Sequence, residues 1–147
     1  MSLITFYIIA FSIGIIVSIY LPMNSIVANH VGSTKMATMA FFFIAFATTF
    51  LFYCLTEERH LLKNIFSAPL YLYASGIVGA FVVIGVTFMI PKLGAAPLFI
   101  LMISGQIIMS MFISHFGVLE SPVSSINISK IIGVCLMLGG SYLAVNG

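Results

Sequence analysis

Three polar side chains, spaced four residues apart, interrupt an apolar stretch of the sequence: Gln106, Ser110 and Ser114. On a helix this spacing places them on one face, as a stripe that drifts slowly around the axis. An amide and two hydroxyls donate and accept hydrogen bonds without carrying charge. The stripe is therefore either a wall that binds a small polar molecule or a set of hydrogen bonds to neighbouring helices.

A second polar group follows Pro22 directly and contains Asn24 and Asn29. Proline inside a helix removes one backbone N–H and leaves one carbonyl without its usual donor. In an apolar surrounding, neighbouring polar groups must satisfy that carbonyl. The two amides therefore either repair the break or line a polar cavity beside it.

The remaining ionisable side chains form no catalytic or metal-binding set. None of the three histidines has a partner at the spacing of metal ligands. The three acidic residues all fall outside the apolar stretches: Glu57, Glu58 and Glu120. We therefore predict no enzyme activity, no metal and no cofactor. The missing buried carboxylate also favours a neutral or zwitterionic ligand over a cation.

The amino-acid composition indicates whether the chain is surrounded by water or by lipid. Only 5% of its 147 residues are charged and 62% are hydrophobic, whereas a soluble domain carries about a quarter charged residues. The chain is therefore predicted to be an integral membrane protein, with the lipid bilayer around it. The absence of a basic patch excludes nucleic acid as a partner.

Five apolar stretches are long enough to cross the membrane, which takes about 20 helical residues. The connecting loops are short, so we expect an all-α fold that forms one transmembrane domain over residues 1–147. The predicted spans are 3–29, 36–55, 69–90, 97–115 and 128–146.

The third and fourth spans form a predicted hairpin. Pro91 is expected to end the third span, because proline donates no hydrogen bond and disfavours helix at the residue before it. Gly94 permits the turn, and Pro97 suits the first turn of the next helix.

Small residues spaced four apart mark two spans as packing faces. Close approach of helices in lipid depends on such residues, because association there rests on packing. The predicted helix-packing residues are Gly76, Gly79 and Ala80 in the third span, and Gly140 and Ala144 in the fifth.

Charge gives the chain almost no preferred orientation. Five spans put the termini on opposite sides, with Arg59, Lys63 and Lys130 on the N-terminal side and Lys35 and Lys92 on the other. Orientation follows the excess of Lys and Arg in short loops, and here that excess is nearly nil. Many transporters are built from two inverted halves around a midplane site. A short chain that inserts both ways supplies both halves by pairing with an inverted copy.

Motifs along nearly the whole chain resemble the YdcZ-like short five-helix family of the drug/metabolite transporter superfamily. They occur in the family's order: Leu21-Pro22-Met23-Asn24-Ser25, Gly76-x-x-Gly79-Ala80, Pro91-x-Leu93-Gly94-Ala95, Gly105-Gln106 and His115-Phe116-Gly117, followed by a glycine-bearing last helix. One position departs from the pattern, because relatives commonly carry an acidic residue where this chain has Ser114. If that carboxylate couples protons or binds cations in relatives, this chain must do so differently or not at all.

The resemblance implies a multi-pass protein of the bacterial inner membrane and half of an inverted-repeat transporter. The predicted function is transport of a small organic metabolite or drug-like solute by alternating access in a homodimer, for which parallel and antiparallel arrangements both stay open. Gln106, Ser110, Ser114, Asn24 and Asn29 are the predicted substrate-binding residues. The alternative is a non-transporting membrane subunit that stabilises or regulates another complex.

Overall fold

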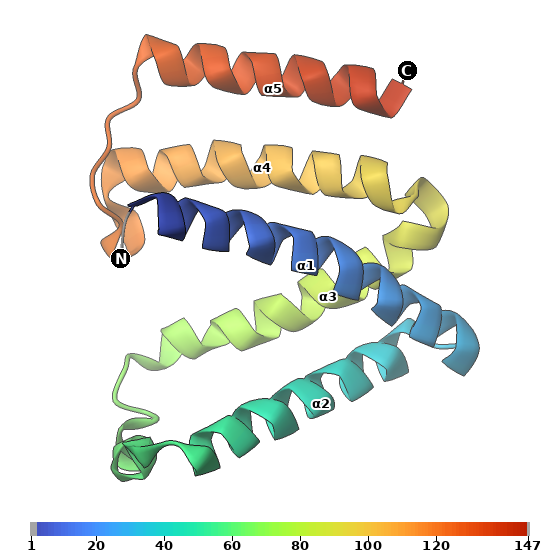
Figure 1. Cartoon of the computed structure of the whole chain (residues 1–147), viewed down its shortest axis with the longest axis vertical. Helices are drawn as coiled ribbons and strands as arrows, with labels where there is room; N and C mark the ends of the chain where they lie inside the picture. Colours follow the sequence, from blue (N-terminus) through green and yellow to red (C-terminus); the bar gives the residue numbers. More distant parts are fainter. Residues whose placement is uncertain (1–2, 147) are drawn as a thin grey trace. The chain divides into compact units, whose positions relative to one another are not determined.

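The computed structural model describes residues 3–146, and for residues 57–59 the backbone only. Five long helices follow one another along the chain (Figure 1), and each is long and apolar enough to cross a membrane. They are α1 (Leu3–Val31), α2 (Thr34–Leu55), α3 (Ala74–Leu93), α4 (Ala95–Phe116) and α5 (Ile128–Asn146). Three short 3₁₀ helices lie in the loops: η1 (Glu57–Asn64), η2 (Leu70–Tyr73) and η3 (Val118–Glu120). The predicted all-α membrane fold is confirmed.

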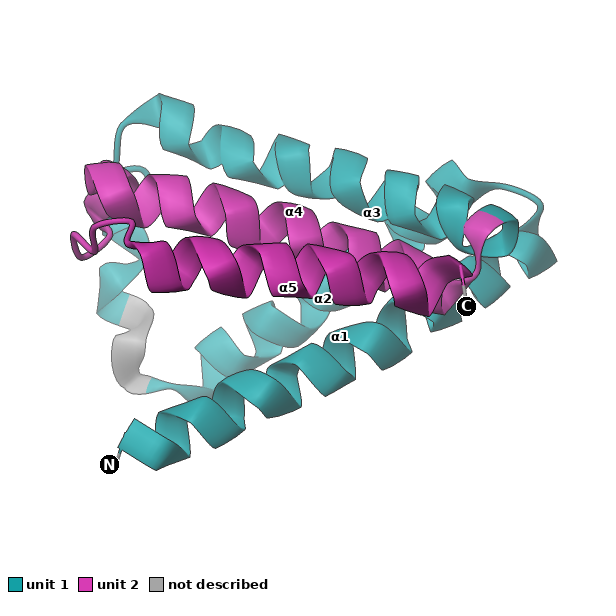
Figure 2. Ribbon diagram, turned by 90° about the horizontal axis from the view of Figure 1, so that it is seen from above, with its two compact units in different colours: residues 1–92 teal, residues 93–147 magenta. Residues whose placement is uncertain are grey.

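The chain divides into two compact units, coloured separately in Figure 2. Unit 1 is Met1–Lys92 and contains α1, α2 and nearly all of α3. Unit 2 is Leu93–Gly147 and contains α4 and α5. Each unit is described below by itself.

In unit 1, α1 and α2 are joined by a turn at Gly32 and Ser33. Gly32 has φ +75°, a left-handed conformation that glycine adopts without steric cost. The Ser33 hydroxyl then caps α2 by accepting the backbone N–H of Met36 at 3.3 Å. The two helices pack together, and Tyr20 stacks on Phe41 with ring centroids 5.6 Å apart.

Both prolines of unit 1 that were expected to disturb a span lie inside continuous helices. Pro22 lies within α1, as predicted. The prediction that Pro91 ends the third span is wrong, because α3 continues to Leu93. A helix passing through proline leaves the carbonyl four residues earlier without a donor. In α3 that carbonyl belongs to Thr87, and the Ser25 hydroxyl of α1 donates to it at 3.2 Å. A hydrogen bond from another helix thus lets α3 pass through its proline.

In unit 2, α4 and α5 run side by side in Figures 1 and 2. Gly94, with φ +84°, caps the start of α4, and Pro97 lies in its first turn, as predicted. The hydroxyls of Ser104 and Ser141 join the two helices at 3.1 Å.

The loop from α4 to α5 is held by the His-Phe-Gly end of α4. Gly117 has φ +63°, and a Cβ placed there meets Val123 Cγ2 at 2.8 Å, so only glycine fits this turn. The imidazole Nδ1 of His115 accepts the Ile126 backbone N–H at 3.1 Å. This motif is therefore a structural anchor for the returning loop.

The buried side chains are as often polar as apolar, in contrast to a soluble core. Large hydrophobic side chains cover the outside, as expected for a protein in lipid. The buried polar residues are Asn24, Ser25, Thr38, Thr87 and Ser104. Four of these five belong to unit 1, where they mark the region most able to bind a polar group.

Candidate functional site

The centre of unit 1 is a hydrogen-bonded cluster between α1 and α3. The Asn24 amide Nδ2 donates to Thr87 Oγ1 at 2.8 Å, beside the Ser25 bond to the Thr87 carbonyl. The exposed fractions of Asn24, Ser25 and Thr87 are 6%, 3% and 1%. At 1.5 Å per residue, the cluster lies about 10 Å from the C-terminal ends of both helices. It is a polar junction inside the span.

A cavity of about 310 Å³ opens from this cluster towards the end of unit 1 where α1 meets α2. It is lined by the end of α1, the turn, the start of α2 and the last turns of α3: Ala28, Asn29, Gly32, Ser33, Thr34, Thr87, Phe88, Pro91 and Lys92. Thr87 therefore belongs both to the buried cluster and to the cavity wall. The Lys92 ammonium lies 3.8 Å from the centroid of the Phe88 ring.

The two predicted asparagines take different positions. Asn29 is exposed and lines this polar cavity. Asn24 is buried and lines a neighbouring, more apolar cavity of about 260 Å³ between α1 and α2, together with Tyr20 and Phe41. The Asn24 amide donates to Thr87 of α3, and the neighbouring Ser25 hydroxyl donates to the carbonyl that Pro91 leaves free.

The predicted stripe on α4 is only partly brought together. Ser110 and Ser114 line one cavity of about 220 Å³ in unit 2, together with Met111, Ser124 and Lys130. Ser110 donates to its own helix at the Ile107 carbonyl, 2.9 Å away, and Ser114 lies 3.4 Å from the Ser121 hydroxyl.

Gln106 differs from both serines. It is exposed midway along α4. No described side chain or backbone group forms a hydrogen bond with its side-chain amide. The amide is thus placed at the middle of a span with its hydrogen-bonding capacity unused.

The Lys130 ammonium, which lines the unit 2 cavity, already has a hydrogen-bond acceptor for each of its N–H groups. The Lys130 ammonium donates to Ser124 Oγ and the Ser125 carbonyl at 2.7 Å each, and to the Ser124 carbonyl at 3.2 Å. An ammonium has three N–H donors, so this lysine holds the loop against the start of α5 and has no donor left.

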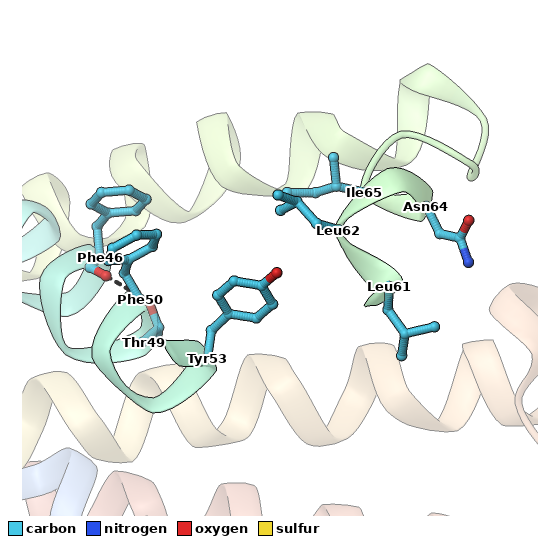
Figure 3. Close-up of a pocket in the computed structure, with 8 residues that line it drawn as sticks. All are labelled: Phe46, Thr49, Phe50, Tyr53, Leu61, Leu62, Asn64 and Ile65. Carbon is cyan, nitrogen blue, oxygen red and sulfur yellow. Dashed lines mark hydrogen bonds between the residues drawn. The ribbon is translucent and has the colours of Figure 1, made fainter. Parts of the chain in front are cut away.

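A further cavity, of about 410 Å³, lies between the end of α2 and η1 in unit 1. Figure 3 shows the rings of Phe46, Phe50 and Tyr53 on one side and Leu62 and Ile65 on the other. The Thr49 hydroxyl there bonds to its own helix, at the Ala45 and Phe46 carbonyls. The cavity is therefore an apolar one that offers contact area but little polar recognition.

The glycines of the predicted packing faces border open space within the described residues. A Cβ placed on Gly76, Gly79 or Gly140 meets no described atom within 4 Å. Ala80 is half-buried and Ala144 is exposed. The contacts predicted for these residues therefore stay predictions about a second molecule.

Sequence reasoning missed two of the residues that hold the interior together, Thr87 and Ser104. Thr87 was detectable, because it lies four residues before Pro91 and its carbonyl must find another donor. Ser104 carried no such signal, since its partner Ser141 is on another helix. Within the described residues no group of three or more His, Cys, Asp or Glu side chains is placed to hold a metal.

Comparison with protein families identifies the group to which these features belong. The family model described as "Putative inner membrane exporter, YdcZ" matches residues 5–143, nearly the whole chain. The chain belongs to this family. It is accordingly a multi-pass protein of the inner membrane, and its family points to transport rather than catalysis. No curated protein and no solved structure matches the chain.

Proposed function

We propose that the chain is a half-size exporter that moves a small organic solute by alternating access as a homodimer. The family description supports export at a coarse level. The observation that carries the finer proposal is the unpartnered amide of Gln106 at the middle of α4. In hydrocarbon, a polar group without a hydrogen-bond partner costs several kcal/mol. We expect a solute or a second copy to meet this face.

The need for a second copy is supported by the length of the chain and by its open glycine faces. Five spans supply half of an inverted-repeat transporter, whose site lies between two halves. Gly76, Gly79 and Gly140 leave room for a helix of another molecule. The balance of three cationic side chains against two on the two sides supports insertion in both orientations and hence an antiparallel pair.

The alternative function, a non-transporting subunit of another complex, is favoured by the same open glycine faces. Flux by the purified chain separates the two functions. Vesicles containing only this protein are loaded with a bacterial metabolite extract, and mass spectrometry follows which solutes leave. Transport predicts release of a small set of solutes above that from empty vesicles. Release equal to empty vesicles, from protein shown to be folded and inserted, would favour the subunit.

A further inference from the structure

The cavity of unit 1 beside Lys92 lies on a side of the membrane where the sequence has no acidic side chain. Successive spans cross the membrane in opposite directions, so Lys35, after the first span, and Lys92, after the third, lie on the same side. Glu57, Glu58 and Glu120 all fall in loops on the opposite side. By this topology, the acidic residues of one copy lie on the opposite side of the membrane from its Lys35 and Lys92.

The Lys92 ammonium is held at the cavity wall with its hydrogen-bonding capacity free. It lies over the Phe88 ring, 3.8 Å from the centroid, in a cation–π contact that fixes the side chain from one face. No described oxygen accepts a hydrogen bond from it. Lys130, by contrast, has three acceptors. The difference leaves Lys92 with donors for an external ligand.

The first turn of α2 adds donors of the same polarity to the cavity. The N–H groups of Met36 and Ala37 are bonded to Ser33, while those of Thr34 and Lys35 precede the first intrahelical bond. The N-terminus of a helix carries a partial positive charge, which favours an anion. Ser33 and Thr34 line the cavity together with the Asn29 amide.

A buried hydroxyl without a partner lies one helical turn deeper. Thr38 is 3% exposed, and its Oγ1 has no hydrogen-bond partner among the described residues. Four residues after Thr34, it lies on the same face of α2. A threonine in a helix usually bonds back to the carbonyl four residues earlier. Thr38 is not among the residues that line the cavity, so its hydroxyl is a buried unpaired group beneath the first turn of α2 and not part of the cavity wall.

From the cavity, the free ammonium of Lys92, the start of α2 and the Asn29 side chain in the cavity wall, we propose that this cavity binds an anion: the carboxylate or phosphate group of a small solute or of a lipid headgroup. Its use in transport rests on the proposed function, in which it would receive the anionic end of an acidic or zwitterionic solute. The absence of a carboxylate from the spans fits such a substrate, because no buried negative charge repels it.

Lysine side chains give a direct readout of anion binding at each cation. The protein is produced with lysine labelled by ¹³C at Cε, which leaves the ammonium donors unmodified, and is placed in phosphatidylcholine nanodiscs. Sodium phosphate and sodium benzoate are titrated against sodium chloride of equal ionic strength. The Lys92 signal should shift saturably, while that of Lys130, whose ammonium already has three acceptors in unit 2, should not. Parallel, unsaturable shifts of both signals, or no shift, would overturn the proposal.

A variant tests the donors of the cavity without removing the lysine probe. Asn29→Ala should raise the phosphate concentration at half-saturation about tenfold or more, the effect of losing one hydrogen bond to a charged group. Asn146→Ala removes an amide that bonds to the Tyr142 carbonyl in unit 2, and should leave that concentration unchanged. Equal effects of the two variants would contradict a site at Asn29.

Nanodiscs containing phosphatidylglycerol separate the two sources of the anion. If the headgroup is the ligand, the Lys92 signal is already displaced and phosphate adds nothing. If a soluble anion is the ligand, the phosphate titration is unchanged. Flux without a selective Lys92 signal would overturn this site and leave the proposed function standing. A selective, saturable Lys92 signal in a protein without flux would support the anion site and overturn the proposed transport function.

Discussion

The hydrogen bond from Ser25 to the Thr87 carbonyl should stabilise the protein only because Pro91 is present. Ser25→Ala removes the donor and leaves a buried carbonyl unpaired, since Thr87 is 1% exposed and proline supplies no N–H. Pro91→Ala restores the N–H within α3. In that background the carbonyl has a donor of its own, and Ser25→Ala should matter little.

The expected magnitude follows from hydrogen bonds measured between membrane helices. They average about 0.6 kcal/mol and reach about 1.7 kcal/mol. An unpaired buried acceptor costs about 1–3 kcal/mol. We therefore expect Ser25→Ala to lower the free energy of unfolding by about 1–2 kcal/mol with Pro91 and by less than about 0.5 kcal/mol with Ala at that position.

The assay is unfolding in mixed micelles with increasing SDS, followed by circular dichroism, for the four proteins of this double-mutant cycle. Ser12→Ala is the matched control, because the Ser12 hydroxyl is exposed and bonds only to its own helix at the Ile8 carbonyl. It should change stability equally little in both backgrounds. If Ser25→Ala lowers the free energy of unfolding equally with and without Pro91, the Ser25 hydroxyl does not replace the donor that Pro91 removes from the Thr87 carbonyl.

Two further outcomes are expected. Gly117→Ala should destabilise unit 2 by about 1–2 kcal/mol, because alanine disfavours φ +63° and its Cβ would meet Val123 at 2.8 Å. In the same unfolding assay, adding Val123→Ala should recover part of the lost stability. Full recovery would show that the backbone angle costs nothing. C-terminal reporter fusions should be active on both sides of the membrane, since the charge bias is three against two; activity on one side only would remove the antiparallel pair.

The helices could be predicted from sequence because each depends on local composition. Long apolar runs, Gly94 and Pro97 locate the α3–α4 turn without reference to the rest of the chain. The continuation of α3 through Pro91 could not be predicted in the same way. It depends on Ser25, a residue of another helix, and proline alone gives the opposite expectation.

The candidate site was predictable by residue type but not by grouping. Both Asn24 and Asn29 lie in polar surroundings. Asn24 is buried and donates to Thr87 of α3, whereas Asn29 is exposed and lines the cavity of about 310 Å³. Lys92 was assigned from the sequence only to one side of the membrane, together with Lys35. Its place in a cavity depends on α1 and α2 meeting the end of α3, which no spacing along the sequence reveals.

Solute flux by a Gln106 variant tests the central claim most directly. Gln106→Leu should reduce release of the solutes that the unaltered protein exports from extract-loaded vesicles about tenfold to hundredfold, while expression and dimer assembly stay normal. The reason is that an apolar side chain costs little in lipid, but leaves a polar group of the solute unpaired at a cost of about 1–3 kcal/mol. Ser110→Ala should reduce flux less, because its hydroxyl already bonds to the Ile107 carbonyl. Unchanged flux in Gln106→Leu would contradict a solute-binding role for this face.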